Sequence, residues 1–128
     1  MVLKTLIVDD EPVARRVLRE DLEQIDEIAL IAEAEDGASA LDAIHDLSPD
    51  LVFLDLQMPV MGGLDAARLI RTADPNAKIV IFTMHESQQM KDEIARIGVQ
   101  AHAVKSAPMK NLLDTIKSVL GTDEPRVN

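Results

Sequence analysis

The chain has 128 residues, which suits one domain, and its 47% hydrophobic and 28% charged residues are typical of a globular protein. No apolar run approaches the roughly 18 residues that a membrane span requires, and the absence of cysteine excludes disulfides and thiolate metal sites. The net charge of −10 argues against direct binding of nucleic acid, because an acidic surface repels phosphate groups. At the start of the chain, residues 1–4 enter a strand pattern directly and show no signal peptide, so we expect a cytoplasmic protein.

Short apolar runs and amphipathic segments alternate five times, which is the pattern of βα units around a parallel sheet. In chain order we predict a strand at 3–8, a helix from Pro12, a strand at 29–34, a helix at 38–47, a strand at 51–54, a helix that ends before Pro75, a strand at 78–82, a helix at 87–97 that stops at Gly98, a strand at 102–104, and a helix from Pro108 to Gly121. The sequence therefore predicts an α/β domain over residues 1–121. The polar residues 122–128 predict a tail or the start of a linker.

The 3.6-residue helical period predicts which side of each helix is buried. The first helix has the apolar stripe Ala14, Val17, Leu18, Leu22 and Ile25, and the third has Ala66, Leu69, Ile70 and Ala73. The helix at 87–97 has only a thin stripe, Met90, Ile94 and Ile97, which is consistent with an element that shifts easily and equally with an ordinary exposed helix.

Four of the apolar runs end in residues that can bind a phosphoryl group or its metal. These residues are Asp9 and Asp10, Asp55, Thr83, and Lys105. Because the carboxyl ends of parallel strands lie along one edge of a sheet, where open α/β folds bind ligands, we expect the side chains to converge. Carboxylate oxygens are the ligands that Mg²⁺ prefers, so the set suits Mg²⁺ together with a phosphoryl group.

Four of these five residues also have an ordinary structural explanation. Asp10 precedes a helix and could be its N-cap, and Asp55 could solvate the end of a strand. Thr83 is a β-branched residue at the end of a strand, and a solvated lysine is the default for Lys105. Their joint placement at strand ends favours a functional site.

The same residues carry a resemblance to a known family. The stretch Leu6–Pro12 (LIVDDEP), the stretch Asp50–Gly63 (DLVFLDLQMPVMGG), Thr83 and Lys105 together resemble a response-regulator receiver domain. The resemblance covers about residues 3–120. It implies a flavodoxin-like, doubly wound, five-stranded parallel sheet of order 2-1-3-4-5 with five helices, the strand order that receivers share with flavodoxin.

The resemblance implies a metal site and a phosphoacceptor. Asp55 would accept a phosphoryl group from the phosphohistidine of a sensor kinase or phosphotransfer protein, as a signalling phosphoacceptor rather than an enzyme. Asp10, Asp55 and the backbone carbonyl of Gln57 would hold Mg²⁺, or Mn²⁺ in its place. Asp9 would reach the ion directly or through water.

The resemblance also implies how the signal is read. Lys105 would pair with one phosphoryl oxygen and Thr83 would donate a hydrogen bond to another, which would pull the following loop inward. The face formed by residues 87–97, 102–104 and 108–121 would then change its preference for a partner, for a second copy of the chain, or for an attached output domain.

Two positions beyond the site differ from most receivers. His102 stands where Tyr or Phe is usual, and we expect it to act as the switch side chain and to make the response sensitive to pH. The alternative is a histidine on an exposed strand. Ser106 stands where many receivers have proline. In this respect the chain resembles receivers that are attached to helix-turn-helix DNA-binding domains.

Three further residues are expected to tune the lifetime of the phosphoryl group. Met84 follows Thr83, where small residues are common, and its side chain either crowds the phosphoryl group or packs down. Gln57 and His85 lie two residues after Asp55 and Thr83, at positions that flank the path of attacking water in this family.

Three other functions remain open from the sequence. The first is a receiver-like interaction module that takes no phosphate. It remains an alternative because Met84 and His102 stand where receivers usually have other residues. A Mg²⁺-dependent aspartyl phosphohydrolase of the haloacid dehalogenase type would place its nucleophile after the first strand and would need a cap. A flavin-binding module would need surface aromatics, whereas Phe53 and Phe82 lie in predicted strands.

Overall fold

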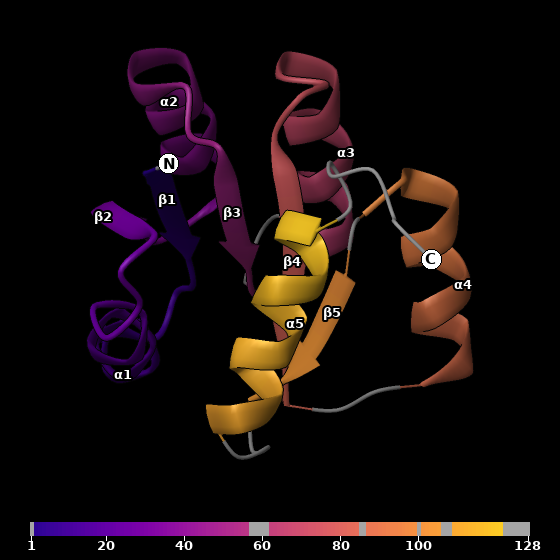
Figure 1. Ribbon diagram of the computed structural model, residues 1–128. Coiled ribbons are helices and arrows are strands. Elements are labelled where there is room, and N and C mark those ends of the chain that lie inside the picture. The colour runs from indigo at the N-terminus through magenta and orange to yellow at the C-terminus, as the bar shows by residue number, and fades with distance from the viewer. Residues whose placement is uncertain (1, 57–61, 85–86, 100, 106–108, 122–128) are drawn as a thin grey trace.

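The computed structural model describes residues 2–56, 62–84, 87–99, 101–105 and 109–121. Five strands and five helices alternate along the chain (Figure 1). They are β1 (Leu3–Val8), α1 (Pro12–Leu22), β2 (Ile28–Ala34), α2 (Gly37–Leu47), β3 (Leu51–Leu54), α3 (Gly63–Ala73), β4 (Lys78–Thr83), α4 (Gln88–Ile97), β5 (Ala101–Val104) and α5 (Met109–Gly121). The predicted alternation is confirmed: β1 and β3 have their predicted bounds, and each other strand differs by a single residue at one end.

The strands form one parallel sheet of order β2-β1-β3-β4-β5, as predicted. β1 therefore has β2 on one side and β3 on the other, so the strand order reverses between β1 and β3. The crevice outside the carboxyl ends of strands at such a reversal is where open α/β sheets bind their ligands. This topology directs attention to the residues that follow β1 and β3.

The sheet is covered by helices on both faces, and each face has its own apolar core. Alternate residues of β3 serve the two cores: Val52 and Leu54 pack with α2, α3 and α4, whereas Leu51 and Phe53 pack with α1 and α5. All four side chains of β3 are buried. The run of consecutive apolar residues in β3 follows from this double coverage, because no position of the strand faces water.

Two of the predicted helix faces were partly wrong. Val17 is 50% exposed and Leu69 is 42% exposed, whereas each was predicted to face the core. In α3 the buried positions are Gly63, Ala66, Ala67 and Ile70. The i, i+3, i+4 spacing locates a stripe but not the flank that meets the sheet. Here the sheet covers the flank of Ala67 and leaves that of Leu69 in solvent.

The first helix is also shorter than its apolar stripe suggested. α1 ends at Leu22, so Ile25 lies in the following turn, where it packs against the core shared with α5. The predicted stop of α4 is confirmed: Gly98 has φ +86°, a left-handed conformation that glycine adopts without strain. None of the helices in the described ranges is both long and apolar enough to cross a membrane.

The start of α3 lies against the end of β3. A Cβ atom placed on Gly63 would lie within 3.0 Å of the carbonyl oxygen of Asp55 and of the Cα atom of Leu56. The amide of Gly63 donates a 2.9 Å hydrogen bond to the carbonyl of Leu56. The missing side chain of Gly63 therefore lets α3 approach the backbone that carries Asp55.

We predict that Gly63→Ala lowers the free energy of unfolding. The loss should be at or above the upper end of the roughly 1–3 kcal/mol typical of overpacking, because the new methyl group meets backbone rather than a movable side chain. Urea unfolding monitored by circular dichroism measures the change.

Gly62→Ala is the matched control, because nothing lies within 4 Å of a Cβ atom there. It should cost at most about 1 kcal/mol, through a weaker N-cap of α3. Equal losses in the two variants would contradict the steric argument.

Candidate functional site

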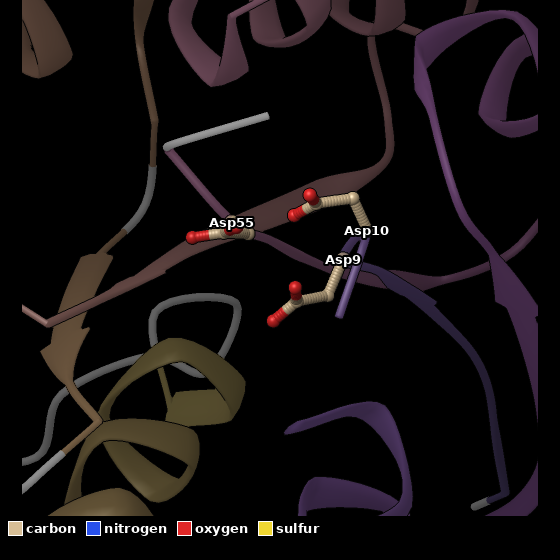
Figure 2. A group of neighbouring side chains, drawn as sticks. All are labelled: Asp9, Asp10 and Asp55. Atoms are coloured by element: carbon tan, nitrogen blue, oxygen red, sulfur yellow. The ribbon is translucent and has the colours of Figure 1, made fainter. Parts of the chain in front are cut away.

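Three carboxylates gather at the carboxyl ends of β1 and β3 (Figure 2). One oxygen from each of Asp9, Asp10 and Asp55 lies within 4.8 Å of the other two. Asp9 and Asp10 directly follow β1, and Asp55 directly follows β3. Asp9 is 4% exposed and Asp55 is 6% exposed, whereas Asp10 lies in solvent. The strand reversal thus places two buried carboxylates and one exposed carboxylate around a single point.

Lys105 supplies a positive charge next to the two buried carboxylates. Its Nζ atom lies 2.7 Å from Oδ2 of Asp9 and 3.2 Å from Oδ1 of Asp55. Burial by itself lowers the pKa of the Lys105 ammonium, but the hydrogen bond to Asp9 and the charges of Asp55 and Asp9 together outweigh this, and the pKa is raised. Lys105 is therefore protonated at neutral pH and offsets part of the repulsion between the carboxylates.

Thr83 ends β4, the strand between β3 and β5, and is 2% exposed. Its carbonyl accepts a 2.6 Å hydrogen bond from the amide of Lys105, which continues the pairing of Thr83 with Val104. This bond fixes the start of the Lys105 segment against the end of β4. The strand ends predicted to converge therefore do lie along one edge of the sheet.

The backbone around Asp9 is held by several groups. Its amide donates to the carbonyl of Ala34 at 3.1 Å, and its Oδ1 accepts a 2.9 Å hydrogen bond from the amide of Glu11. Its carbonyl accepts a 2.6 Å hydrogen bond from Nη1 of Arg15, near the start of α1. Sequence reasoning missed Arg15. The one signal in the sequence is that Arg15 lies near the start of the first helix, close enough along the chain for its side chain to reach back to the acidic end of the preceding strand.

The other predicted residues divide by whether the structure describes them. Met84 is 48% exposed, and His102 is partly buried in β5 opposite Ile81 of β4. Gln57, His85 and Ser106 lie outside the described residues, so their predicted roles stay predictions.

The donor set fits a hard divalent cation. Among the described residues, one ammonium contacts two of the three carboxylates, so the cluster keeps a net negative charge, and its oxygens are close enough to share one ion. Oxygen ligands without nitrogen or sulfur favour Mg²⁺ or Mn²⁺ over softer metals.

Comparison with known proteins gives the family. The sequence matches the family model of the response regulator receiver domain over residues 5–117. The chain belongs to this family. Members of two-component systems of this kind are signalling proteins rather than classical enzymes.

Individual relatives agree with the family model. The chain is 36% identical to the protein CcdB of Bacillus subtilis, over 92% of this chain and 98% of that one. It is 32% identical to the chemotaxis protein CheY of Halobacterium salinarum, over 94% and 98%. With the nitrate/nitrite response regulator NarP of Escherichia coli the identity is 34%, over 90% of this chain but only 54% of that one. The chain thus spans nearly all of some relatives and about half of others.

A solved structure agrees in three dimensions. A two-component response regulator of the LuxR family from Aurantimonas superposes with a TM-score of 0.89 at 32% identity, over 95% of this receiver and 87% of that chain. The predicted receiver fold is confirmed by this match and by the strand order.

We predict that Lys105→Met destabilises the metal-free protein. The variant leaves Asp9 and Asp55 buried without the ammonium of Lys105, which should lower the free energy of unfolding by about 1–3 kcal/mol. The effect should be seen at neutral pH in EDTA and should fade as pH rises through the raised pKa of Lys105, where the wild-type side chain also loses its charge.

Lys110→Met is the matched control, since Lys110 is an exposed lysine of α5. Its effect should stay within about 0.5 kcal/mol. A stability of Lys105→Met equal to that of Lys110→Met would show that Lys105 does not compensate the carboxylates.

Proposed function

We propose that this receiver is the phosphoacceptor of a two-component phosphorelay, and that Asp55 accepts a phosphoryl group from the phosphohistidine of a kinase or phosphotransfer protein. The observation that carries the proposal is the position of the Asp55 carboxylate. It lies at the strand reversal, 3.2 Å from an ammonium and within 4.8 Å of two further carboxylates. That arrangement offers a nucleophilic oxygen, a cation for a phosphoryl oxygen and ligands for a metal ion.

Asp55 attacks without a separate base. A carboxylate is ionised at neutral pH, so one of its oxygens forms a bond to phosphorus while the phosphorus–nitrogen bond of the phosphohistidine breaks. The product is an aspartyl phosphate and a free histidine on the donor. Lys105 Nζ already lies beside Oδ1 of Asp55, where it binds an oxygen of the incoming phosphoryl group.

Asp10, Asp55 and the backbone carbonyl of Gln57 hold the metal ion in this proposal, with Asp9 in contact directly or through water. The exposed carboxylate of Asp10 supports this role, because Mg²⁺ keeps several waters in its coordination shell. When bound, the ion neutralises charge on the phosphoryl oxygens in the transition state.

Thr83 reads the modification. Its hydroxyl belongs to a buried residue at the end of β4, next to β3, and donates a hydrogen bond to a phosphoryl oxygen once Asp55 is modified. That bond draws the segment between Thr83 and α4 inward. A few charge-assisted hydrogen bonds supply the roughly 5.5 kcal/mol needed to invert a two-state population from 1:99 to 99:1.

The signal leaves through the face formed by α4, β5 and α5. Only Met90 and Ile94 of α4 are buried, so a small apolar area resists a shift of this helix. Phosphorylation then favours a second copy of the chain or an attached output. An attached output is supported by NarP, of which this chain matches about half. A DNA-binding output is supported by Ser106, the residue that resembles receivers joined to helix-turn-helix domains.

We predict a single phosphoryl adduct on the wild-type protein after incubation with acetyl phosphate and Mg²⁺, measured by intact mass. Asp55→Asn removes the nucleophilic oxygen and should give no adduct. Asp50→Asn, at the opposite end of β3, should still be modified, and EDTA should abolish modification of both the wild-type protein and Asp50→Asn.

Absence of any adduct with small donors and with a phosphorylated kinase would overturn the proposal. It would leave a receiver that acts as a phosphate-independent binding module. Repeated turnover of a phosphomonoester would instead indicate a phosphohydrolase.

We also propose that His102 is the switch side chain, and predict a response that depends on pH. Histidine changes charge between pH 5 and 8 in ordinary surroundings, and His102 lies partly buried on β5 beside β4. The change in hydrogen exchange of α4 and β5 on phosphorylation should differ between pH 6 and pH 8.

His102→Tyr should make the two responses equal, whereas His45→Tyr, on an exposed position of α2, should leave the difference in place. Equal wild-type responses at both pH values, unchanged in His102→Tyr, would remove this role.

A further inference from the structure

The side chain of Arg15 lies outside the carboxylate cluster but contacts the backbone of Asp9, one of the residues in the cluster. Nη1 of Arg15 donates a 2.6 Å hydrogen bond to the carbonyl oxygen of Asp9. The Arg15 side chain is only 17% exposed, although it belongs to a surface helix. The guanidinium therefore lies against the ends of β1 and β2 rather than extending into solvent.

A carboxylate on a neighbouring strand orients Arg15. Oε1 of Glu33 lies 3.1 Å from Nε of Arg15, and Oε2 of Glu33 lies 2.7 Å from Nη1 of Arg19. Glu33 is fixed in β2, where it pairs with Ile7 of β1. With Nε bound to Glu33 and Nη1 bound to the Asp9 carbonyl, the planar guanidinium has one orientation.

The bond to the Asp9 carbonyl bears on Asp10. That oxygen belongs to the planar peptide that joins Asp9 to Asp10, so holding it fixes the plane from which the Asp10 Cα atom continues. Within the described ranges, no hydrogen bond or ion pair reaches the Asp10 carboxylate, so its direction depends on its backbone. The amide of Asp9 is already fixed by Ala34, and Arg15 fixes the other side of the residue.

We propose that Arg15, oriented by Glu33, is a positioning residue of the metal site: it fixes the Asp9–Asp10 peptide and so aims the Asp10 carboxylate at the ion. This inference rests on the proposed function, which assigns Asp10 to the metal. Arg15 acts through the backbone and does not touch the ion or the phosphoryl group.

The charge of Arg15 and its proposed positioning role predict opposite changes in Mg²⁺ affinity when Arg15 is replaced, so the direction of the change tests the inference. A guanidinium near a cation site repels the cation, so removing it would tighten Mg²⁺ binding if charge were its only influence. If Arg15 positions Asp10, removing it weakens Mg²⁺ binding in spite of the lost repulsion.

The experiment is isothermal titration of MgCl₂ into the unphosphorylated protein. Arg15→Gln should weaken Mg²⁺ binding about tenfold, at the lower end of the range typical for residues that orient metal ligands. Circular dichroism confirms that the variant is folded at the temperature of the titration.

Arg19→Gln is the matched control. It removes a positive charge from the same helix, and it removes a contact to the same partner, Glu33. Among the described residues, however, the guanidinium of Arg19 contacts Glu33 and not Asp9. Mg²⁺ affinity in this variant should be unchanged within about twofold, or slightly tighter.

Arg15→Lys keeps the charge and removes the two-pronged geometry, so any weakening it causes is not electrostatic. It should weaken Mg²⁺ binding about threefold, and it decides the matter if Arg15→Gln does not fold. Affinities of both Arg15 variants equal to or tighter than that of Arg19→Gln would overturn the inference alone. A wild-type protein that binds no Mg²⁺ would overturn the metal site of the proposed function, and this inference with it.

Discussion

The mutual repulsion of three carboxylates is the constraint on which the rest of this structure depends. Two of them are buried, and one oxygen from each of the three lies within 4.8 Å of the others. Lys105 offsets part of this repulsion from the end of β5, through contacts to Asp9 and Asp55. The cluster still keeps an excess of negative charge, which costs the metal-free fold stability and favours the binding of a cation.

The backbone around the cluster is held by close contacts from neighbouring elements. Gly63 lets α3 lie against the carbonyl of Asp55, and the amide of Lys105 is bonded to the carbonyl of Thr83. The carbonyl of Asp9 is bonded to Arg15, which α1 carries and β2 orients through Glu33. Elements on both faces of the sheet thus contribute to the geometry of one strand edge, and small displacements there would alter the proposed metal and phosphoryl contacts.

The side of the molecule near α4 is held differently. Two side chains of α4 are buried. The polar contacts between α4 and α3 lie toward the later turns of α4, where Glu93 forms an ion pair with Arg68 and the carbonyl of Gly98 accepts a hydrogen bond from Arg71. These contacts join α4 to α3 rather than to the carboxylate cluster. The proposed signal through Thr83 would therefore reach the first turn of α4, which begins at the N-cap Ser87, while the far end stays anchored.

Reading the residues in order was enough to predict the alternation of strands and helices and the convergence of the acidic strand ends with Thr83 and Lys105, and the family resemblance supplied the strand order. This was possible because burial on both faces leaves a continuous apolar run, and parallel strands bring their ends together whatever surrounds them. The packed molecule was needed to show that Val17 and Leu69 lie in solvent, that Gly63 touches the backbone of Asp55, and that Arg15 holds Asp9. The physical reason is that these features depend on how a helix is rotated and how closely it approaches the sheet, which are set by contacts between residues far apart in the chain.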